Sequence, residues 1–165
     1  MKKLNLLWIT LCFPMFLFAQ KNAADQLFEK YADTDGFTTI SFSSGLMKMV
    51  ADMDDEKDSN SFLRKIEEVR IITSDEENAG LNFYEEIVKD LPADEYEELI
   101  TIKEKDTNVK IWIKEDAGIT RELILVSGGE DDNALIIVRG EITLNEISGL
   151  GESLNVNGLS VLSKL

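Results

Sequence analysis

The chain has 165 residues, 44% of them hydrophobic and 30% charged, which is typical of one globular domain and excludes a mostly disordered protein. It carries 17 basic and 32 acidic residues, a net charge of −15, and no histidine. The lack of histidine excludes a Ser-His-Asp triad and a histidine-ligated zinc site. The acidic excess disfavours nucleic acid and anionic membrane surfaces as partners, because both are bound by clustered Lys and Arg.

The N-terminal segment has the pattern of a cleaved secretory signal. Lys2 and Lys3 precede an apolar run over residues 4–18, which ends at Ala19 and is followed at once by polar sequence. This run is too short for a comfortable membrane span. We therefore expect residues 1–19 to be a signal peptide and the protein to be exported, to the periplasm or out of the cell.

The position of the single cysteine indicates whether the exported chain carries a lipid anchor. Cys12 lies inside the apolar run rather than at its end after small residues, so a lipoprotein anchor is not expected. Signal cleavage would remove Cys12 and leave residues 20–165 as a single domain without a disulfide, a thiolate nucleophile or a sulfur-ligated metal. We expect no cofactor.

The first half of the chain alternates helical and strand patterns. Helices are predicted near residues 20–35, 46–53, 61–69 and 76–91, where apolar side chains recur at helical spacing. Strands are predicted at 37–43, which is rich in β-branched and aromatic residues, and at 70–73. The apolar faces of the four helices would comprise Ala24, Leu27, Phe28 and Tyr31; Leu46, Met49, Val50 and Met53; Phe62, Ile66 and Val69; and Leu81, Tyr84, Val88 and Leu91.

From Tyr96 onward the apolar period changes to two. Strand-like runs at 99–103, 109–114, 122–126 and 134–139 are joined by short connections, which predicts consecutive hairpins. Within the last run, residues 134–138 are all apolar, as in a central strand covered on both faces. A capping-box pattern at 143–146 predicts a helix to about residue 150, and the apolar tail over 154–165 is expected to dock. The predicted fold is therefore α+β, a single domain of early β-α-α-β-α units followed by a four-stranded antiparallel meander and a C-terminal helix.

Two patterns could bind metal. The turn Asp33–Gly36 resembles the start of a calcium loop, but Phe37 and Ser44 occupy positions where an EF-hand needs oxygen ligands, so a turn is favoured. Met47, Met49 and Met53 resemble copper(I) clusters, although Met47 lies off the helix face that Met49 and Met53 share. Methionine in a core is the simpler interpretation.

Acidic groups at 52–58, 75–77, 94–98 and 130–132 could supply the carboxylate pair of a glycosidase or bind calcium weakly. Each group falls in a predicted loop or on a solvent face, so acidic surface is the simpler interpretation. The alternative function that these groups support is a small carboxylate-dependent hydrolase or a carbohydrate-binding protein.

One apolar strand face is a candidate partner site. Trp112 points away from Ile111 and Ile113, and if Leu123 and Leu125 share its face, that face needs a cover. The terminal helix and tail would cover it in one interpretation. Otherwise Trp112, Leu123 and Leu125 would form an exposed patch that binds a partner.

The patterns F-T-T-I-S-F-S, V-R-I-I, V-K-I-W-I-K, R-E-L-I-L-V and A-L-I-I-V-R-G-E-I, after a leader ending in L-F-A-Q, resemble the domain of unknown function 4252 family. The resemblance extends to I-T-L-N-E-I-S-G-L and N-V-N-G-L near the C-terminus. It implies a small exported protein of Bacteroidota-type bacteria without a catalytic signature. Many relatives resemble lipoproteins, and this chain differs from them because Cys12 does not lie where a lipoprotein signal places its cysteine.

Together these observations predict an exported, non-catalytic protein that binds another cell-envelope protein. A hydrolase or carbohydrate-binding protein is the first alternative, and a weak divalent-metal or copper binder is the second.

Overall fold

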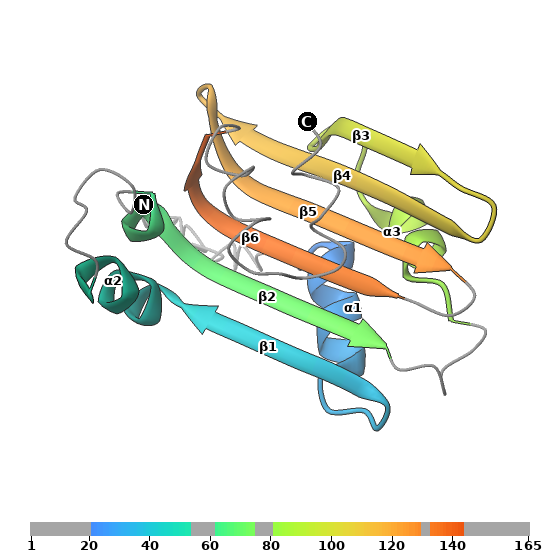
Figure 1. Ribbon diagram of the computed structural model, residues 1–165. Coiled ribbons are helices and arrows are strands. Elements are labelled where there is room, and N and C mark those ends of the chain that lie inside the picture. The colour runs from blue at the N-terminus through green and yellow to red at the C-terminus, as the bar shows by residue number, and fades with distance from the viewer. Residues whose placement is uncertain (1–20, 54–61, 75–80, 130–132, 144–165) are drawn as a thin grey trace, which may run out of the picture.

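The computed structural model describes residues 21–53, 62–74, 81–129 and 133–143. Over these residues the chain forms an antiparallel sheet with helices, which confirms the α+β class (Figure 1). The helices are α1 (Ala23–Tyr31), α2 (Ser44–Met53) and α3 (Phe83–Asp90), with a 3-10 turn η1 at Leu63–Lys65. The strands are β1 (Phe37–Ser43), β2 (Ile66–Ser74), β3 (Glu97–Lys103), β4 (Thr107–Asp116), β5 (Ile119–Gly129) and β6 (Ala134–Ile142).

The strands form one six-stranded sheet in the order β1-β2-β6-β5-β4-β3. The predicted hairpins from β3 to β6 are all present, and β6 also pairs with β2, which pairs with β1. The meander is therefore part of a larger sheet rather than a separate one. The early elements run α-β-α-β-α, in place of the predicted β-α-α-β-α order. β6 is central and almost wholly buried, as its unbroken apolar run predicts.

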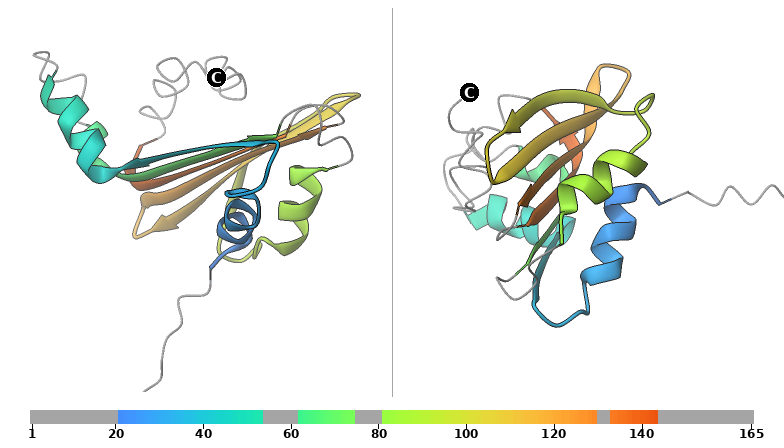
Figure 2. Two further views of the ribbon diagram at one scale, coloured as in Figure 1. Left: turned by 90° about the horizontal axis from the view of Figure 1, so that it is seen from below. Right: turned by 90° about the vertical axis from the view of Figure 1, so that its right-hand side faces the viewer.

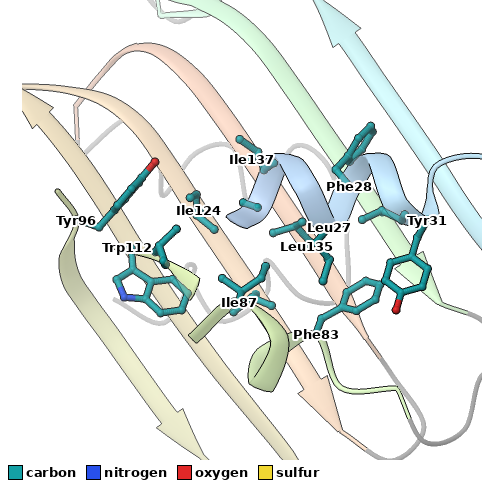
Figure 3. Packing of buried hydrophobic residues seen from close by; sticks show 14 residues of the cluster. Leu27, Phe28, Tyr31, Phe83, Ile87, Tyr96, Trp112, Ile124, Leu135 and Ile137 are labelled. Atoms are coloured by element: carbon teal, nitrogen blue, oxygen red, sulfur yellow. The ribbon is translucent and has the colours of Figure 1, made fainter. Parts of the chain in front are cut away.

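Helices α1 and α3 lie side by side on one face of the sheet (Figure 2). Their apolar sides pack onto strand residues to form the first core cluster, in which Tyr31 and Phe83 stack at 5.5 Å between ring centroids (Figure 3). α1 begins where the side chain of Asn22 accepts a hydrogen bond from the backbone N–H of Asp25. The buried face of α1 is the predicted one: Ala24, Leu27, Phe28 and Tyr31.

The opposite face of the sheet carries a second cluster of buried aliphatic residues, among them Ile71, Ile111, Leu125 and Ile136. Of the helices described, α2 contributes to this cluster, through Met47. α2 follows β1 and extends past the end of the sheet, tilted away from the face that α1 and α3 cover (Figure 2, left).

The helix predicted over 61–69 is wrong. Among the residues described from 62 onward, the single turn η1 precedes β2, and Ile66 and Val69 lie in that strand. A shift of register between Ile66 and Glu68 explains the error. A bulge inserts one residue, so two inward positions of a strand stand three apart, which is the spacing of a helix.

α3 begins at Phe83, and its buried residues are Phe83 and Ile87. Of the predicted face, Leu91 is buried in the first core cluster and Leu81 and Tyr84 pack against it, but Val88 is 37% exposed. α3 follows Asn82, whose side chain accepts a hydrogen bond from the backbone N–H of Glu85. It ends at Asp90, one residue before the predicted end at Leu91, next to Pro92.

The predicted capping-box helix, the apolar tail and the loop at 54–60 lie outside the described residues. Within the described part of the chain, no helix combines the length and apolar character needed to cross a bilayer.

Candidate functional site

A row of charged side chains crosses the sheet at the edge of the first core cluster. Glu68 of β2 pairs in register with Arg139 of β6, and Arg139 pairs in register with Glu122 of β5. Glu122 in turn pairs with Lys114 of β4. Directly opposed residues on antiparallel strands project from the same face, so these alternating charges lie beside one another.

Arg139 is the centre of this row. Its Nη2 donates hydrogen bonds to both carboxylate oxygens of Asp25 at 2.8 Å and to Oε1 of Glu122 at 2.6 Å. Its Nη1 donates to Glu68 at 3.0 Å, and its Nε donates to Glu122 at 3.0 Å. One guanidinium, whose side chain is 25% exposed, thus binds three carboxylates from β2, β5 and α1. Guanidinium suits this role because its donors are spread in a rigid plane.

Arg70 supplies a second guanidinium to the same carboxylates. Its Nε donates to Glu68 at 2.8 Å and its Nη1 to Asp25 at 3.3 Å. The guanidinium also lies over the ring of Phe28, 5.3 Å from the ring centroid. Asp25 is in the first turn of α1, where a carboxylate also interacts favourably with the helix dipole. These contacts fasten the N-terminal end of α1 to the sheet.

Glu122 is the most buried carboxylate of the group, its side chain 9% exposed. Besides the bonds from Arg139, its Oε2 accepts a hydrogen bond from the hydroxyl of Tyr96 at 2.6 Å. The side-chain amide of Asn22 donates to both Tyr96 and Glu122. We call the seven residues Asn22, Asp25, Glu68, Arg70, Tyr96, Glu122 and Arg139 the Arg139 cluster.

Two protonation equilibria follow from this environment. Burial of the phenol, and then its hydrogen bond to Glu122, raise the pKa of Tyr96 well above its usual value near 10. The pKa of Arg139 is also raised: burial opposes the charge, but Asp25 and Glu122 outweigh burial. At neutral pH the phenol is therefore protonated and donates, and the guanidinium is charged.

Replacing Tyr96 with phenylalanine is expected to lower the free energy of unfolding by about 1–2 kcal/mol at neutral pH, because Glu122 loses a buried donor. A phenol whose pKa is raised by folding stabilises the native state fully below the unfolded-state pKa. It loses that contribution as the pH rises above about 10. Wild type should thus lose stability between about pH 9 and pH 11 by more than Tyr96→Phe does.

Urea unfolding at both pH values measures this difference. Tyr84→Phe is the control: it removes a half-buried phenol outside the cluster and leaves Tyr96 and its bond to Glu122 in place, so the alkaline loss that depends on Tyr96 should remain. An alkaline loss in Tyr96→Phe as large as in wild type would contradict the assignment.

The charged groups of the Arg139 cluster form their hydrogen bonds within the cluster. Each of its carboxylates accepts hydrogen bonds from a guanidinium, and its phenol is held protonated. A guanidinium keeps its proton at physiological pH, so neither Arg70 nor Arg139 can act as a general base. The arrangement can join α1, β2, β5 and β6 and the Tyr96 segment. Its three carboxylates outnumber its two guanidinium groups, and each carboxylate is hydrogen-bonded within the cluster.

The acidic groups predicted from sequence are only partly within the described residues. Among them, Glu95 pairs with Lys114 and Glu98 pairs with Lys110. The bond from Lys110, and next that from Thr101, lower the pKa of Glu98, opposite to the raised pKa of a glycosidase acid. Across the described ranges, no three Asp, Glu, His or Cys side chains are close enough to hold a metal ion.

The methionines are divided between two environments. Met47 is buried in the second core cluster, while Met49 and Met53 are on the exposed side of α2. The structure does not bring the three sulfur atoms to one copper(I) site.

Trp112, Leu123 and Leu125 do not share a face. The β4–β5 register pairs Trp112 with Ile124, so Trp112 belongs to the cluster beneath α1 and α3. Leu123 and Leu125 point to the opposite face, and all three residues are buried. The expectation that they form one exposed patch is therefore wrong, because alternation fixes faces within a strand but not between strands until the register is known.

Sequence reasoning missed the Arg139 cluster. The available signal was that Glu122 and Arg139 stand at the ends of apolar runs, at positions whose alternation turns them toward the core. Opposite charges at such positions in neighbouring strands indicate a buried pair. Asp25, Asn22 and Tyr96 join the cluster only through tertiary contacts.

Comparisons with curated proteins and with solved structures give no match. A family model does match, over residues 31–150, which includes β1 to β6, α2, α3 and five of the seven residues of the Arg139 cluster. The chain therefore belongs to the family described as domain of unknown function (DUF4252).

Proposed function

We propose that this protein is exported and acts without catalysis, by binding another protein of the cell envelope through the exposed side of α2. The observation that carries the proposal is an apolar stripe on that helix. Met49, Val50 and Met53 are 55%, 43% and 79% exposed, and Leu46 continues the stripe toward the helix start. We call Leu46, Met49, Val50 and Met53 the α2 stripe.

The stripe has the spacing by which a helix enters an apolar groove. Its members stand at i, i+3, i+4 and i+7, so they align along one side of α2. Met47 and Ala51 are buried on the inward side of the same helix, and Met47 anchors the helix to the second core cluster of the sheet. An outward row of large apolar side chains on an anchored helix is costly in water unless a partner covers it, and methionine adapts to irregular partner surfaces.

The remaining chemistry agrees with a binding role. The Arg139 cluster uses its charges internally, and Asp52 on α2 pairs with Arg64. The partner site is therefore expected to be an apolar groove rather than a charged surface.

Replacing Met49 and Met53 with serine is expected to reduce recovery of the envelope partner at least tenfold, which corresponds to about 1.4 kcal/mol of binding free energy. The measurement is affinity capture from envelope fractions with wild type and variant in parallel. Val88→Ser is the matched control, since it removes an exposed apolar side chain from α3 and should leave recovery unchanged. Equal recovery with the Met49→Ser, Met53→Ser variant, or no partner above background with wild type, would contradict the proposal.

Export is tested separately, by the mass of the protein isolated from cell fractions. A chain lacking residues 1–19 outside the cytoplasm is expected. A full-length chain in the cytoplasm would contradict export.

A further inference from the structure

The two edges of the sheet differ in how they are protected. An edge strand presents a row of unpaired N–H and C=O groups, and soluble proteins usually block such edges with charges or bulges. The β3 edge has both: it carries Glu97, Glu98 and Lys103, and its pairing with β4 shifts register between Glu98 and Ile100.

The β1 edge has neither device. Its sequence, Phe37 to Ser43, contains no charged residue and no proline, and its pairing with β2 runs over seven residues without a shift. Thr38, Ile40 and Ser41 are exposed, with Ile40 at 39%. Among the described residues, the outer backbone groups of β1 make no hydrogen bond with another segment.

We propose that the β1 edge pairs antiparallel with the β1 edge of a second copy of this chain, joining two sheets into one across a two-fold axis at Ile40. The charge of the protein favours this edge for self-association. Two copies of a chain with net charge −15 repel each other, and β1 is an edge where they can approach without opposing like charges.

The sequence of β1 is also self-complementary about Ile40. In this register Ile40 faces Ile40 of the second copy, and Phe42 faces Thr38 on the same side of the sheet. Thr39 faces Ser41 on the other side. Apolar and β-branched side chains thus meet one another, and hydroxyls meet hydroxyls, which are the favourable cross-strand pairs.

A further contact supports the register. Ser43 would face Phe37 of the second copy, so the turn with Asp35 would approach the start of the second copy's α2. The first turn of α2 contains no acidic residue of its own. A carboxylate there interacts favourably with the N-terminal end of the helix dipole.

Sedimentation velocity of the purified protein over a range of concentrations tests the proposal. Wild type is expected to dimerise, and Ile40→Lys and Ile40→Glu are each expected to weaken the dimer at least tenfold, because like charges would face each other at the axis. An equimolar mixture of the two variants should recover the dimer as a heterodimer, since opposite charges then meet. Thr101→Lys, which adds the same charge to the exposed side of β3, should leave the wild-type dimer unchanged.

Circular dichroism shows whether each variant is folded. If the Ile40 variants do not fold, Thr38→Lys places a charge against Phe42 of the second copy and should also weaken the dimer. A wild type that stays monomeric, including one that binds only an extended segment of another protein, would overturn the proposal. So would folded Ile40 variants that dimerise like wild type, or a mixture that stays monomeric.

Discussion

Replacing Arg139 with methionine should lower the free energy of unfolding by about 3 kcal/mol, the largest side-chain effect that we expect outside the apolar clusters. Methionine keeps the length of the side chain but removes the charge. Asp25, Glu68 and Glu122 then remain close together, with only Arg70 left to bind the first two. Removing one partner from a buried ion pair costs about 3–5 kcal/mol. The lower end applies because the Arg139 side chain is a quarter exposed.

Urea unfolding at neutral pH measures this effect. The control is Arg121→Met, which breaks an exposed pair with Glu141 and should change stability by no more than about 0.5 kcal/mol. Adding Glu122→Gln to Arg139→Met should recover part of the loss, since it removes the most buried of the unpaired charges. A loss below about 1 kcal/mol for Arg139→Met would show that the cluster does not hold α1 to the sheet.

The strands of the second half could be predicted because two physical signals agree there. Strict alternation, as in Val109 to Ile113, identifies a strand, and the short connections leave hairpins as the only pairing. The apolar run over residues 134–138 of β6 correctly indicated a central position. The first strand, β1, was predicted with its observed bounds because it is rich in β-branched and aromatic residues.

What the sequence could not reveal depends on register and tertiary contact. Because of the bulge in β2, Ile66 and Val69 face the same side although they stand three positions apart, which is also the spacing of a helix. The apolar row of α2 was predicted as a face, but whether it turns inward depends on where β1 leaves the sheet, and Met47 and Ala51 turn inward instead. Alternation could have indicated the Glu122–Arg139 pair, but Asp25 lies 114 positions from Arg139, so neither spacing nor periodicity could indicate that it joins them.

The backbone beside Arg139 explains how the cluster is positioned. Gly140 follows Arg139 in β6 and has φ of 151°, a conformation that residues with a side chain rarely adopt. A Cβ at this position would lie 2.3 Å from the carbonyl oxygen of Lys65 and 2.9 Å from the Cα of Ile66. β6 therefore passes very close to the start of β2, at the register shift that precedes the pairing of Glu68 with Arg139. Both the close approach of β6 to β2 and the ion pair between Glu68 and Arg139 therefore depend on Gly140 having no side chain.

Replacing Gly140 with alanine should consequently cost about 3 kcal/mol or more in urea unfolding, because the strained φ and the clash with the backbone of β2 add together. Gly118→Ala separates the two causes. Gly118 also has a positive φ, 78°, but a Cβ there would meet nothing within 4 Å, so only the conformational cost of about 1–2 kcal/mol applies. If Gly140→Ala loses no more stability than Gly118→Ala, the close approach of β6 to β2 is not what fixes the register. If Gly140→Ala loses more, the excess measures the contribution of that approach. In the Gly140→Ala background, Arg139→Met should then cost much less stability than it does in wild type, because Glu68 and Arg139 would no longer be held in register.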